Sequence, residues 1–501
     1  MLFDYDNHDE QSILRYAKQA VGKTFRELAE EYKNSKYKSY EEAHNKNNTD
    51  FFIQEATPDY KLNMNAKGAL GNFMEKYYFG YQPNGIQDAD LSDIGIEIKQ
   101  TCIDKTKKGA LRAGERLSIT NISYNEPVTH DFYKSHVWIK IRRILLIHYL
   151  RDKTIDKYDY QILFANLFTP PKEDMEIIKA DYQKIISIIE SGNAQDLSEG
   201  LTMYLGACTK GATALSSLQP QYYGNHSLAK KRNFCFKQNY MNYILHTYIL
   251  QDEVPYESII KDSNQLQNQS FDEYVLSMLN QHIGKSDVQL CQELDIEYNK
   301  NKAQYSTLGF HMLGIKNNKA AEFEKAGIIM KSIRVEENNT IKESMSLPPF
   351  VFKELIEEVW DDSTLYNYFE EHRFLFVVFK KDGEHYYFKG AKLWHMNKND
   401  LETHLKEGWE QTVNIIKEGV QFTFRQGKQL TIKNNLPGSK DNHVIHVRPH
   451  TQNTAYKLNN GYEKGDLAKD GDQLPNGEYM TKQSFWINRS YIMEQIKEFL
   501  K

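Results

Sequence analysis

The sequence predicts an α/β protein with mixed sheets of the α+β kind, in which one core is present twice. Three observations lead to this expectation. With 501 residues, the chain is long enough for about two to three domains, each with its own core. Helical and strand-like patterns alternate along the first half. Short segments of the first half recur, in the same order, in the second half.

The first part of the chain alternates between helical and polar segments. Residues 13–22 have the pattern of a helix that ends at Gly22. Residues 31–50 are polar and rich in Lys and Asn, which predicts a loop. Residues 67–79 carry apolar side chains at helical spacing, which predicts a second helix.

A strand with two different faces is predicted near residue 97. Ile96 and Ile98 alternate with Glu97 and Lys99, as in a strand of which one face is buried. The two charged side chains therefore point the same way.

The rest of the first half is more apolar. Residues 137–150 form a nearly continuous apolar run, and a long helix follows Pro171 and ends before Gly192. Residues 251–300 are polar, rich in Gln, Asn and Asp, and contain some amphipathic helix. They are interpreted as a connection between two domains.

Four pairs of segments carry the internal repeat. The pairs are residues 90–99 with 322–331, 115–119 with 343–347, 188–192 with 415–419, and 231–241 with 482–492. Their spacing drifts along the chain, as loop insertions would cause. The repeat predicts a first domain at 1–255, a connecting segment at 256–300 and a second copy at 301–501.

Net charge does not indicate a nucleic-acid partner, because it is −5 at pH 7. Local charge does. Three basic clusters occur, at Lys99, Lys105, Lys107, Lys108, Arg112 and Arg116; at Lys140, Arg142, Arg143 and Arg151; and at Lys230, Lys231 and Arg232. They could neutralise phosphates. The alternative, which charge alone favours, is a solvated surface with acidic segments elsewhere in the chain.

The four cysteines are far apart and form no CxxC motif, so neither a zinc site nor a disulfide framework is expected. A reducing, cytoplasmic environment fits this usage. No segment approaches the roughly 20 consecutive apolar residues of a membrane span, and the acidic start of the chain lacks a signal-peptide pattern. We expect a cytoplasmic protein without a membrane partner.

Asp90, Glu97 and Lys99 are the candidate catalytic residues. Hydrolysis of a phosphodiester needs an activated water and charge neutralisation at phosphorus, and Mg²⁺ held by carboxylates supplies both. Magnesium prefers hard oxygen ligands and keeps several waters, so few carboxylates suffice. Glu97 and Asp90 can be these ligands, and Lys99 can orient the water.

The triplet Glu97–Lys99 alone is a weak signal. Glu31 and Lys33 have the same spacing on a segment that could be helical. The alternative for Glu97 and Lys99 is a solvated strand face with a cross-strand ion pair.

The context of the triplet resembles the MutH family. The segments Lys67-Gly-Ala-Leu-Gly-Asn-Phe-Met-Glu75, Asp90 through Lys99, and Ser135-His-Val-Trp-Ile-Lys140 match that family in content, order and spacing. The family comprises the mismatch-repair nicking enzyme and restriction endonucleases that cut at GATC.

The resemblance extends from about Ile13 to Leu250 and implies a restriction-endonuclease-like core. It implies Asp90 and Glu97 as Mg²⁺ ligands (Mn²⁺ can substitute), Lys99 as the water-orienting cation, Glu75 as a supporting carboxylate and Lys140 as a lysine near the scissile phosphate.

Residues 197–212 and 479–488 are similar to the longer, two-domain GATC-cutting members, whose C-terminal domain is an inactive copy. The resemblance implies DNA contacts by Thr209, Lys210, Gly211 and Lys237. Two departures put the transfer of base contacts in doubt: Cys208-Thr209 replaces an Arg-Pro pair of MutH, and Cys235 replaces a tyrosine.

In the second copy, Ile329 stands at the position of Glu97, so this copy is expected to be inactive although Glu322 and Lys331 remain. Arg448 and His450 fall at the specificity position and are expected to bind DNA. For Trp486 a core position is favoured over a DNA contact.

The function expected is a type II restriction endonuclease that makes Mg²⁺-dependent double-strand cuts, at GATC by resemblance, with the second copy as a DNA-binding effector domain. A MutH-type nicking enzyme is the nearest alternative, and a non-catalytic DNA-binding regulator is the alternative from another class. The expected partner is double-stranded DNA, bound by a dimer, and no small-molecule cofactor is expected.

Overall fold

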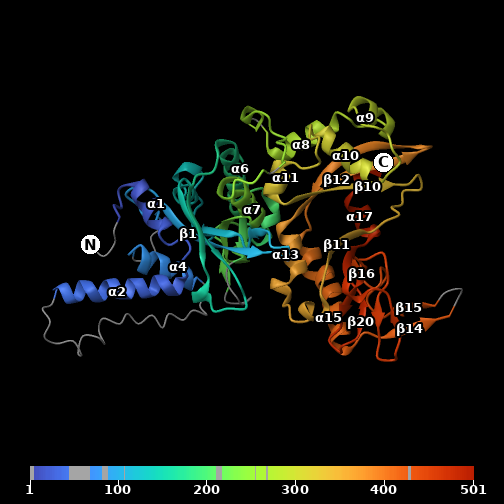
Figure 1. Ribbon diagram of the computed structural model, residues 1–501. Helices are drawn as coiled ribbons and strands as arrows, with labels where there is room; N and C mark the ends of the chain where they lie inside the picture. The colour runs from blue at the N-terminus through green and yellow to red at the C-terminus, as the bar shows by residue number, and fades with distance from the viewer. Residues whose placement is uncertain are drawn as a thin grey trace. The chain divides into compact units, whose positions relative to one another are not determined.

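The chain folds into two compact units. The first comprises Met1–Pro255 with Glu324–Ala326, and the second comprises Tyr256–Phe323 and Gly327–Lys501. The computed structural model describes residues 5–43, 68–81, 88–106, 108–209, 217–253, 255–266, 269–426 and 430–500. In Figure 1 the first unit runs from blue to green, and the second from yellow-green to red.

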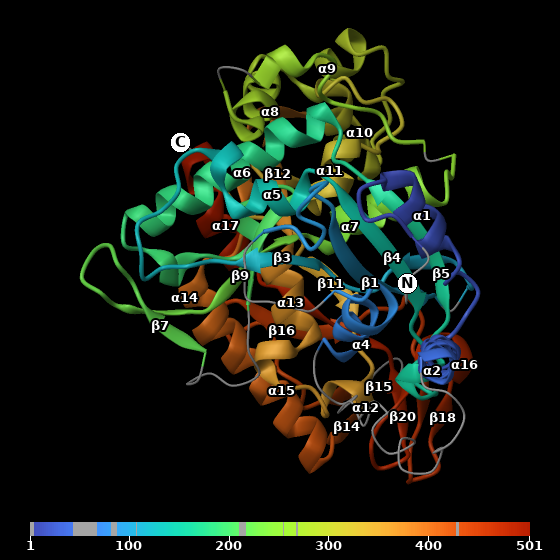
Figure 2. The same ribbon diagram turned by 90° about the vertical axis from the view of Figure 1, so that its left-hand side faces the viewer.

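The first unit contains a mixed sheet, as the sequence predicts. Its order is β2-β1-β4-β5, with β1 parallel to β4 and the other pairs antiparallel. Figure 2 shows β1, β4 and β5 side by side. A second, antiparallel sheet has the order β3-β9-β6, and β7 and β8 form a separate pair. The strands are β1 (Glu97–Lys105), β2 (Leu111–Ala113), β3 (Leu117–Asn121), β4 (Ile144–Leu150), β5 (Ile162–Phe168), β6 (Leu205–Thr209), β7 (Leu218–Pro220), β8 (Leu228–Lys230) and β9 (Arg232–Phe236).

Helices flank these sheets. They are α1 (Glu10–Lys18), α2 (Phe25–Ala43), α4 (Ala69–Phe73) with a following π-helical turn (Met74–Tyr78), α5 (His136–Ile141), α6 (Lys172–Glu190), and α7 (Gln238–Ile244) with a second π-helical turn (Leu245–Ile249). The apolar run at 137–150 is thus α5 followed by β4, a central strand whose first five residues are all buried. No helix among the described residues is long and apolar enough to cross a membrane.

The core of the first unit sets the position of the helix that contains Glu75. Ile96 and Ile98 are fully buried, as the alternation of the sequence predicts. They belong to one apolar cluster with Phe73 and Met74 of the α4 segment. Because these apolar contacts fix the helix against β1, Glu75 is carried toward the charged face of the strand.

One local expectation was wrong. The Lys- and Asn-rich segment from residue 31 was expected to be a loop, but α2 continues to Ala43. This segment has no Pro or Gly, and its Glu, Lys and Ala residues favour helix. Residues 44–50 of the expected loop lie outside the described residues.

The second unit has a sheet of order β10-β12-β13 and an antiparallel sheet of order β11-β21-β16. Two smaller sheets, β14-β15 and β18-β17-β20-β19, complete it. Its strands are β10 (Ile328–Val335), β11 (Met345–Pro349), β12 (Arg373–Asp382), β13 (His385–Trp394), β14 (Phe422–Arg425), β15 (Thr431–Asn434), β16 (Ile445–Pro449), β17 (Tyr456–Lys457), β18 (Glu463–Lys464), β19 (Gly471–Gln473), β20 (Tyr479–Thr481) and β21 (Gln483–Ile487).

Helices of the second unit begin within residues 256–300, where α8 buries Phe271, Val275 and Leu279 and contacts β13. The helices are α8 (Phe271–Asn280), α9 (Asp287–Glu293), α10 (Ala303–Met312), α12 (Phe352–Leu355), α13 (Thr364–Glu371), α14 (Lys398–Asp400), α15 (Lys406–Glu418), α16 (Leu467–Asp470) and α17 (Arg489–Gln495); α11 (Ala321–Ala326) ends in the segment assigned to the first unit.

The two units share a topology. β10 is parallel to β12, and β12 is antiparallel to β13, as in β1, β4 and β5. The sheet β11-β21-β16 is antiparallel throughout, as is β3-β9-β6. A serine caps the helix before each central strand: Ser135 accepts from Trp138 N at 3.1 Å, and Ser363 accepts from Tyr366 N at 3.1 Å.

Asp181 of α6 provides a test of how the first unit is held together. Its buried carboxylate accepts from the main-chain N–H groups of Met203 and Tyr204 at 2.7 Å and of Leu205 at 3.0 Å. Asp181→Ala leaves these donors without their acceptor, and each costs about 1–3 kcal/mol. We expect the unit to lose about 3 kcal/mol or more of stability, measured by thermal or urea unfolding. The exposed Asp196→Ala is the control, and equal melting of both variants would contradict this account.

Candidate active site

Glu97 lies at the centre of a cluster of charged side chains at the start of β1. Its side chain is 1% exposed, although it carries a carboxylate. Lys99, two residues along the same face of the strand, places Nζ 2.7 Å from Glu97 Oε1. The predicted strand geometry is therefore present, but the face is buried rather than solvated. Burying an unpaired carboxylate is costly, so the pairing keeps Glu97 inside the fold.

Lys140 of α5 is the second cation on Glu97. Its Nζ lies 2.9 Å from Oε1 and 3.0 Å from Oε2 of Glu97, and it donates to the Asp88 carbonyl at 3.0 Å. The Ser135 cap and the short helix α5 aim this side chain at the start of β1. Lys140 therefore forms its ion pair with Glu97.

Asp90 approaches from the turn that precedes β1. Its Oδ2 accepts from Ile98 N at 2.9 Å, and its own N–H donates to Glu97 Oε2 at 3.2 Å. Gly95 makes the turn with a φ of 69°, a backbone conformation that residues with a Cβ rarely adopt. The turn thus favours glycine, and it brings Asp90 back beside Glu97, which lies seven positions further along the chain.

Glu75 completes the cluster. It lies in the π-helical turn Met74–Tyr78 and is half-buried. Burial raises the pKa of Glu75 to about 7, and the negative charge of Asp90 adds to this effect, whereas Lys99 and Lys140 act in the opposite direction. A carboxyl group with this pKa is held mainly by its burial, with neighbouring negative charge as the second cause.

The cluster brings together three carboxylates and two ammonium groups. Burial, and then the charge of Glu97, raises the pKa of Asp90. Burial lowers the pKa of Lys99, but the charge and hydrogen bond of Glu97 outweigh it, and the net shift is upward. Lys99 is therefore protonated at neutral pH. Hard carboxylate oxygens that repel one another suit a divalent cation, which relieves the repulsion, so the residues fit the expected metal.

The residues expected to contact DNA in the first unit are only partly described. Thr209 is half-buried at the end of β6, opposite Arg232. Lys210 and Gly211 lie outside the described residues. The surroundings of Lys237 do not favour the DNA contact expected of it: it is 1% exposed, and its Nζ donates to the carbonyls of Thr202 at 3.2 Å and Ala326 at 3.0 Å. A lysine held by two buried carbonyls cannot reach a phosphate without leaving its site.

Arg448 and His450 of the second unit are exposed at the end of β16. The Arg448 guanidinium lies 4.9 Å from the ring centroid of Trp486, which is half-buried. Glu322 is engaged elsewhere, because its carboxylate accepts from Ser258 Oγ at 2.5 Å and Ile259 N at 2.9 Å.

Several cations of the basic clusters are occupied by ion pairs within the fold. Arg151 binds Asp104 at 2.8 Å, Arg116 binds Glu199 at 2.6 Å, and Arg143 pairs with Glu10. These arginines stabilise the fold, so counting basic residues along the sequence overstates the charge available to a phosphate. Lys107 lies outside the described residues.

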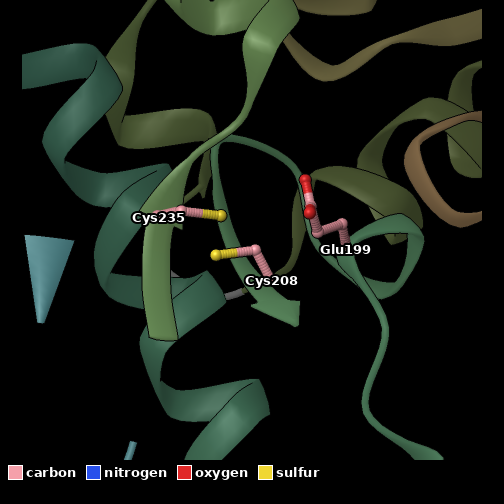
Figure 3. A group of neighbouring side chains, drawn as sticks. All are labelled: Glu199, Cys208 and Cys235. Carbon is pink, nitrogen blue, oxygen red and sulfur yellow. The ribbon is translucent and has the colours of Figure 1, made fainter. Parts of the chain in front are cut away.

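Glu199, Cys208 and Cys235 form a buried cluster that the sequence analysis did not predict (Figure 3). Neighbouring strands β6 and β9 bring the two cysteines together, and a potential ligand atom of each residue lies within 4.8 Å of the others. A hydrogen bond from Cys235 lowers the pKa of Cys208, and burial raises the pKa of Cys235. The set could bind a soft metal ion, but the ion pair with Arg116 already accounts for the buried charge of Glu199. All four cysteines are free and buried.

Comparison with known proteins places these residues in context. Residues 79–181 match the family described as DNA mismatch repair enzyme MutH, a range that includes Asp90, Glu97, Lys99 and Lys140 but not Glu75. The chain is 35% identical over 464 residues to the type II restriction enzyme Sau3AI of Staphylococcus aureus, covering 87% of this chain and 93% of that protein. It is 22% identical over 186 residues to the DNA mismatch repair protein MutH of Yersinia enterocolitica (37% of this chain, 79% of that protein) and 24% identical over 132 residues to that of Yersinia pestis (26% and 56%).

The raised pKa of Glu75 predicts that cation binding is linked to proton release. With a pKa of about 7, the group is about half protonated at pH 7, and a neighbouring divalent cation lowers that pKa. Binding of Mg²⁺ should therefore release roughly half a proton at pH 7, and its affinity should rise with pH up to about 8. Calorimetry in buffers of different ionisation enthalpy measures this.

Glu75→Gln should remove the proton release, whereas Glu190→Gln, at the exposed end of α6, should not. Equal proton release by wild type and Glu75→Gln would show that another group is the source.

Proposed function

This chain belongs to the family of the type II restriction enzyme Sau3AI, and we propose that its first unit cuts both strands of DNA at GATC with Mg²⁺ bound by Asp90 and Glu97. Membership makes the chain a site-specific deoxyribonuclease. The observation that carries the proposal for the site is the buried Glu97, held by Lys99 and Lys140 next to Asp90, within the range that matches the MutH family.

In this proposal, Asp90 and Glu97 hold the cation and Glu75 supports them from the neighbouring helix. The bound Mg²⁺ would supply charge neutralisation at phosphorus and an acidified water. Lys99, whose raised pKa keeps it protonated, donates a hydrogen bond to the attacking water or to the charge that develops on the phosphoryl oxygens. Lys140 keeps the Glu97 carboxylate oriented, and this role is the one that its contacts favour over a direct contact with the phosphate.

Two other functions fit the observations less well than a restriction endonuclease does. A MutH-type nicking enzyme is disfavoured because the similarity to Sau3AI covers 87% of this chain, whereas the similarity to the Yersinia enterocolitica MutH protein covers 37%. A non-catalytic DNA-binding regulator is disfavoured because such a protein has no need of a buried set of carboxylates and lysines. Cleavage assays on methylated and unmethylated GATC plasmids would distinguish all three.

The second unit is, in our proposal, a degenerate copy of the first. Shared strand order and direction support this. In the sequence repeat, Ile329 stands at the position of Glu97. In the parallel pairs, Glu97 is opposite the first residue of β4, whereas Ile328 and Ile329 are opposite the first and second residues of β12, and neither is a carboxylate. Tyr368 lies as far along the chain from the capping serine of α13 as Lys140 lies from the capping serine of α5, so Tyr368 stands at the position of Lys140. The copy would therefore lack both Glu97 and its second cation.

We propose that this copy binds the same DNA site through Arg448 and His450, which are exposed at the end of β16, and that this binding activates the first unit. That is a coupling between two sites. The alternative is a second unit that serves only as a scaffold or a dimer interface.

The catalytic assignment predicts the effect of three substitutions. Asp90→Ala, Glu97→Ala and Lys99→Ala should each lower the plasmid cleavage rate by about a thousandfold or more, because each removes several kcal/mol of charge stabilisation. DNA binding should be retained. Cutting by wild type should require Mg²⁺ or Mn²⁺ and stop in EDTA.

Wild-type rates in any of these variants, or undiminished cutting in excess EDTA, would contradict the assignment. Asp196→Ala, an exposed carboxylate of the same unit, controls for general effects of removing charge.

Symmetry predicts two chains on each site. A palindrome presents two scissile phosphates, and each chain has one complete centre, so double-strand cutting needs two chains or two successive events. Analytical sedimentation should show a 2:1 complex with a short GATC duplex. A strictly monomeric complex that cuts both strands in one binding event would rule out this arrangement.

The effector proposal predicts that plasmids with two sites are cut faster than plasmids with one, and that a short GATC duplex accelerates cutting of the one-site plasmid. Arg448→Ala should reduce this acceleration severalfold, because it removes a cation from the second unit's exposed strand end. Equal rates on the two plasmids, unchanged by added duplex, would favour the scaffold.

A further inference from the structure

The second unit contains a cavity of about 680 Å³ at the place that corresponds, in the proposed repeat, to the catalytic cluster of the first unit. Its walls come from β10, β11, the start of α10 and β21. Lys331, which stands where Lys99 stands in the first copy, lines it. The residues that form this cavity all belong to the second unit.

The cavity wall carries net positive charge. It holds four cations, Lys302, Lys331, Arg334 and Lys342, and two carboxylates, Glu336 and Glu343, which gives a net charge of +2. This balance disfavours a divalent cation as the occupant and favours an anion.

Both carboxylates of the wall are already paired. Glu343 binds Lys302 and lies 3.9 Å from Arg334. Glu336 binds Lys342 at 3.0 Å and accepts from Tyr386 at 2.7 Å. Neither carboxylate is left to neutralise a further cation.

Of the four cations in the cavity wall, Lys331 is the one that takes part in none of these ion pairs. No carboxylate among the described residues forms an ion pair with Lys331. Burial, and then the nearby charge of Lys302, lowers the pKa of Lys331, with no negative group acting in the opposite direction. Lys99 has the reverse environment, because Glu97 lies 2.7 Å away. The replacement of that glutamate by Ile329 has left Lys331 without its negative partner.

We propose that this cavity is a metal-independent phosphoryl-binding site, in which a backbone phosphodiester of DNA supplies to Lys331 the negative charge that Glu97 supplies to Lys99. The side-chain hydroxyls of Ser306, Ser332 and Ser344, which also line the cavity, are further donors to phosphate oxygens. The inference rests on the proposed binding of DNA by the second unit and adds where the backbone enters it. Because the carboxylates are gone or paired, the phosphodiester is held without a cation and is not hydrolysed.

The first test measures how Lys331 contributes to activation by an added duplex. The full chain cuts a one-site plasmid while a short GATC duplex is titrated at several salt concentrations. Lys331→Met, which keeps the length and removes the charge, should raise the duplex concentration for half-maximal activation about tenfold, as loss of one charged hydrogen bond does. It should also reduce the slope of log affinity against log salt by about 0.9, the value for one phosphate contact.

Two variants make this test specific. Lys331→Arg should restore most of the affinity and the salt slope. Lys457→Ala removes a cation of the same unit that does not line the cavity and is paired with Glu463 at 2.8 Å, and it should leave the salt slope as in wild type. Unfolding curves establish that each variant is folded.

The second test uses the amine of Lys331 as a reporter. The full chain is treated with an acylating reagent in EDTA, and modification of Lys331 and Lys457 is measured by mass spectrometry. A duplex should protect Lys331 and not Lys457, whereas inorganic phosphate should protect Lys331 only at much higher concentration. Protection by phosphate with none by the duplex would overturn the assignment to DNA in favour of a free phosphate.

The outcomes separate this inference from the proposed effector function. If wild type is activated by the duplex but Lys331→Met has wild-type affinity and salt slope, the cavity is not the phosphate site and the effector function stands. If wild type is not activated while the duplex protects Lys331 in EDTA, the phosphate site stands and the effector function fails. Protection that requires Mg²⁺ would overturn the metal-independent site.

Discussion

The burial of one carboxylate is the constraint on which the arrangement of the first unit depends. Glu97 is inside the fold at the start of a central strand, and two lysines make this position tolerable. Lys99 comes from the same strand, but Lys140 must be delivered by α5, whose Ser135 cap sets where the helix begins. Because α5 leads directly into β4, and β4 is parallel to β1, the sheet register and the ion pairs fix each other.

The same constraint explains how the two units can share a topology and differ in chemistry. If, as proposed, Ile329 replaces Glu97 in a second copy, its apolar side chain needs no cation, and a tyrosine can stand at the position of Lys140. The lysine on the strand then has different surroundings: Lys99 is a member of a nearly balanced cluster, whereas Lys331 faces a cavity with excess positive charge. In the proposed assignment, the exchange of Glu97 for Ile329 changes the sign of the charge that the site accepts.

Much of the fold was predictable because it depends on local pattern. Alternating Ile96 and Ile98 gave the buried face of β1, and the stripe after Pro171 gave α6. The site residues of the β1 region came from the resemblance rather than from periodicity. Properties that arise only in three dimensions were not predicted. Lys237 was expected to be a surface cation, but its side chain is buried and donates to main-chain carbonyls. The cluster of Glu199, Cys208 and Cys235 forms because β6 and β9 pair. Nothing in a single sequence marks such contacts.

The wide spacing of the cluster along the chain has a consequence for biosynthesis. Glu75, Asp90 and Glu97 leave the ribosome well before Lys140, and β1 needs β4, which follows Lys140, as its parallel partner. Contacts between distant segments form late in folding, because the intervening loop must close first. A nascent chain that ends before Lys140 and β4 therefore has Glu97 without one of its lysines on a strand without its parallel partner. Partial chains that end before β4 lack the strand that pairs with β1, so the proposed centre cannot form in them until that strand has been made.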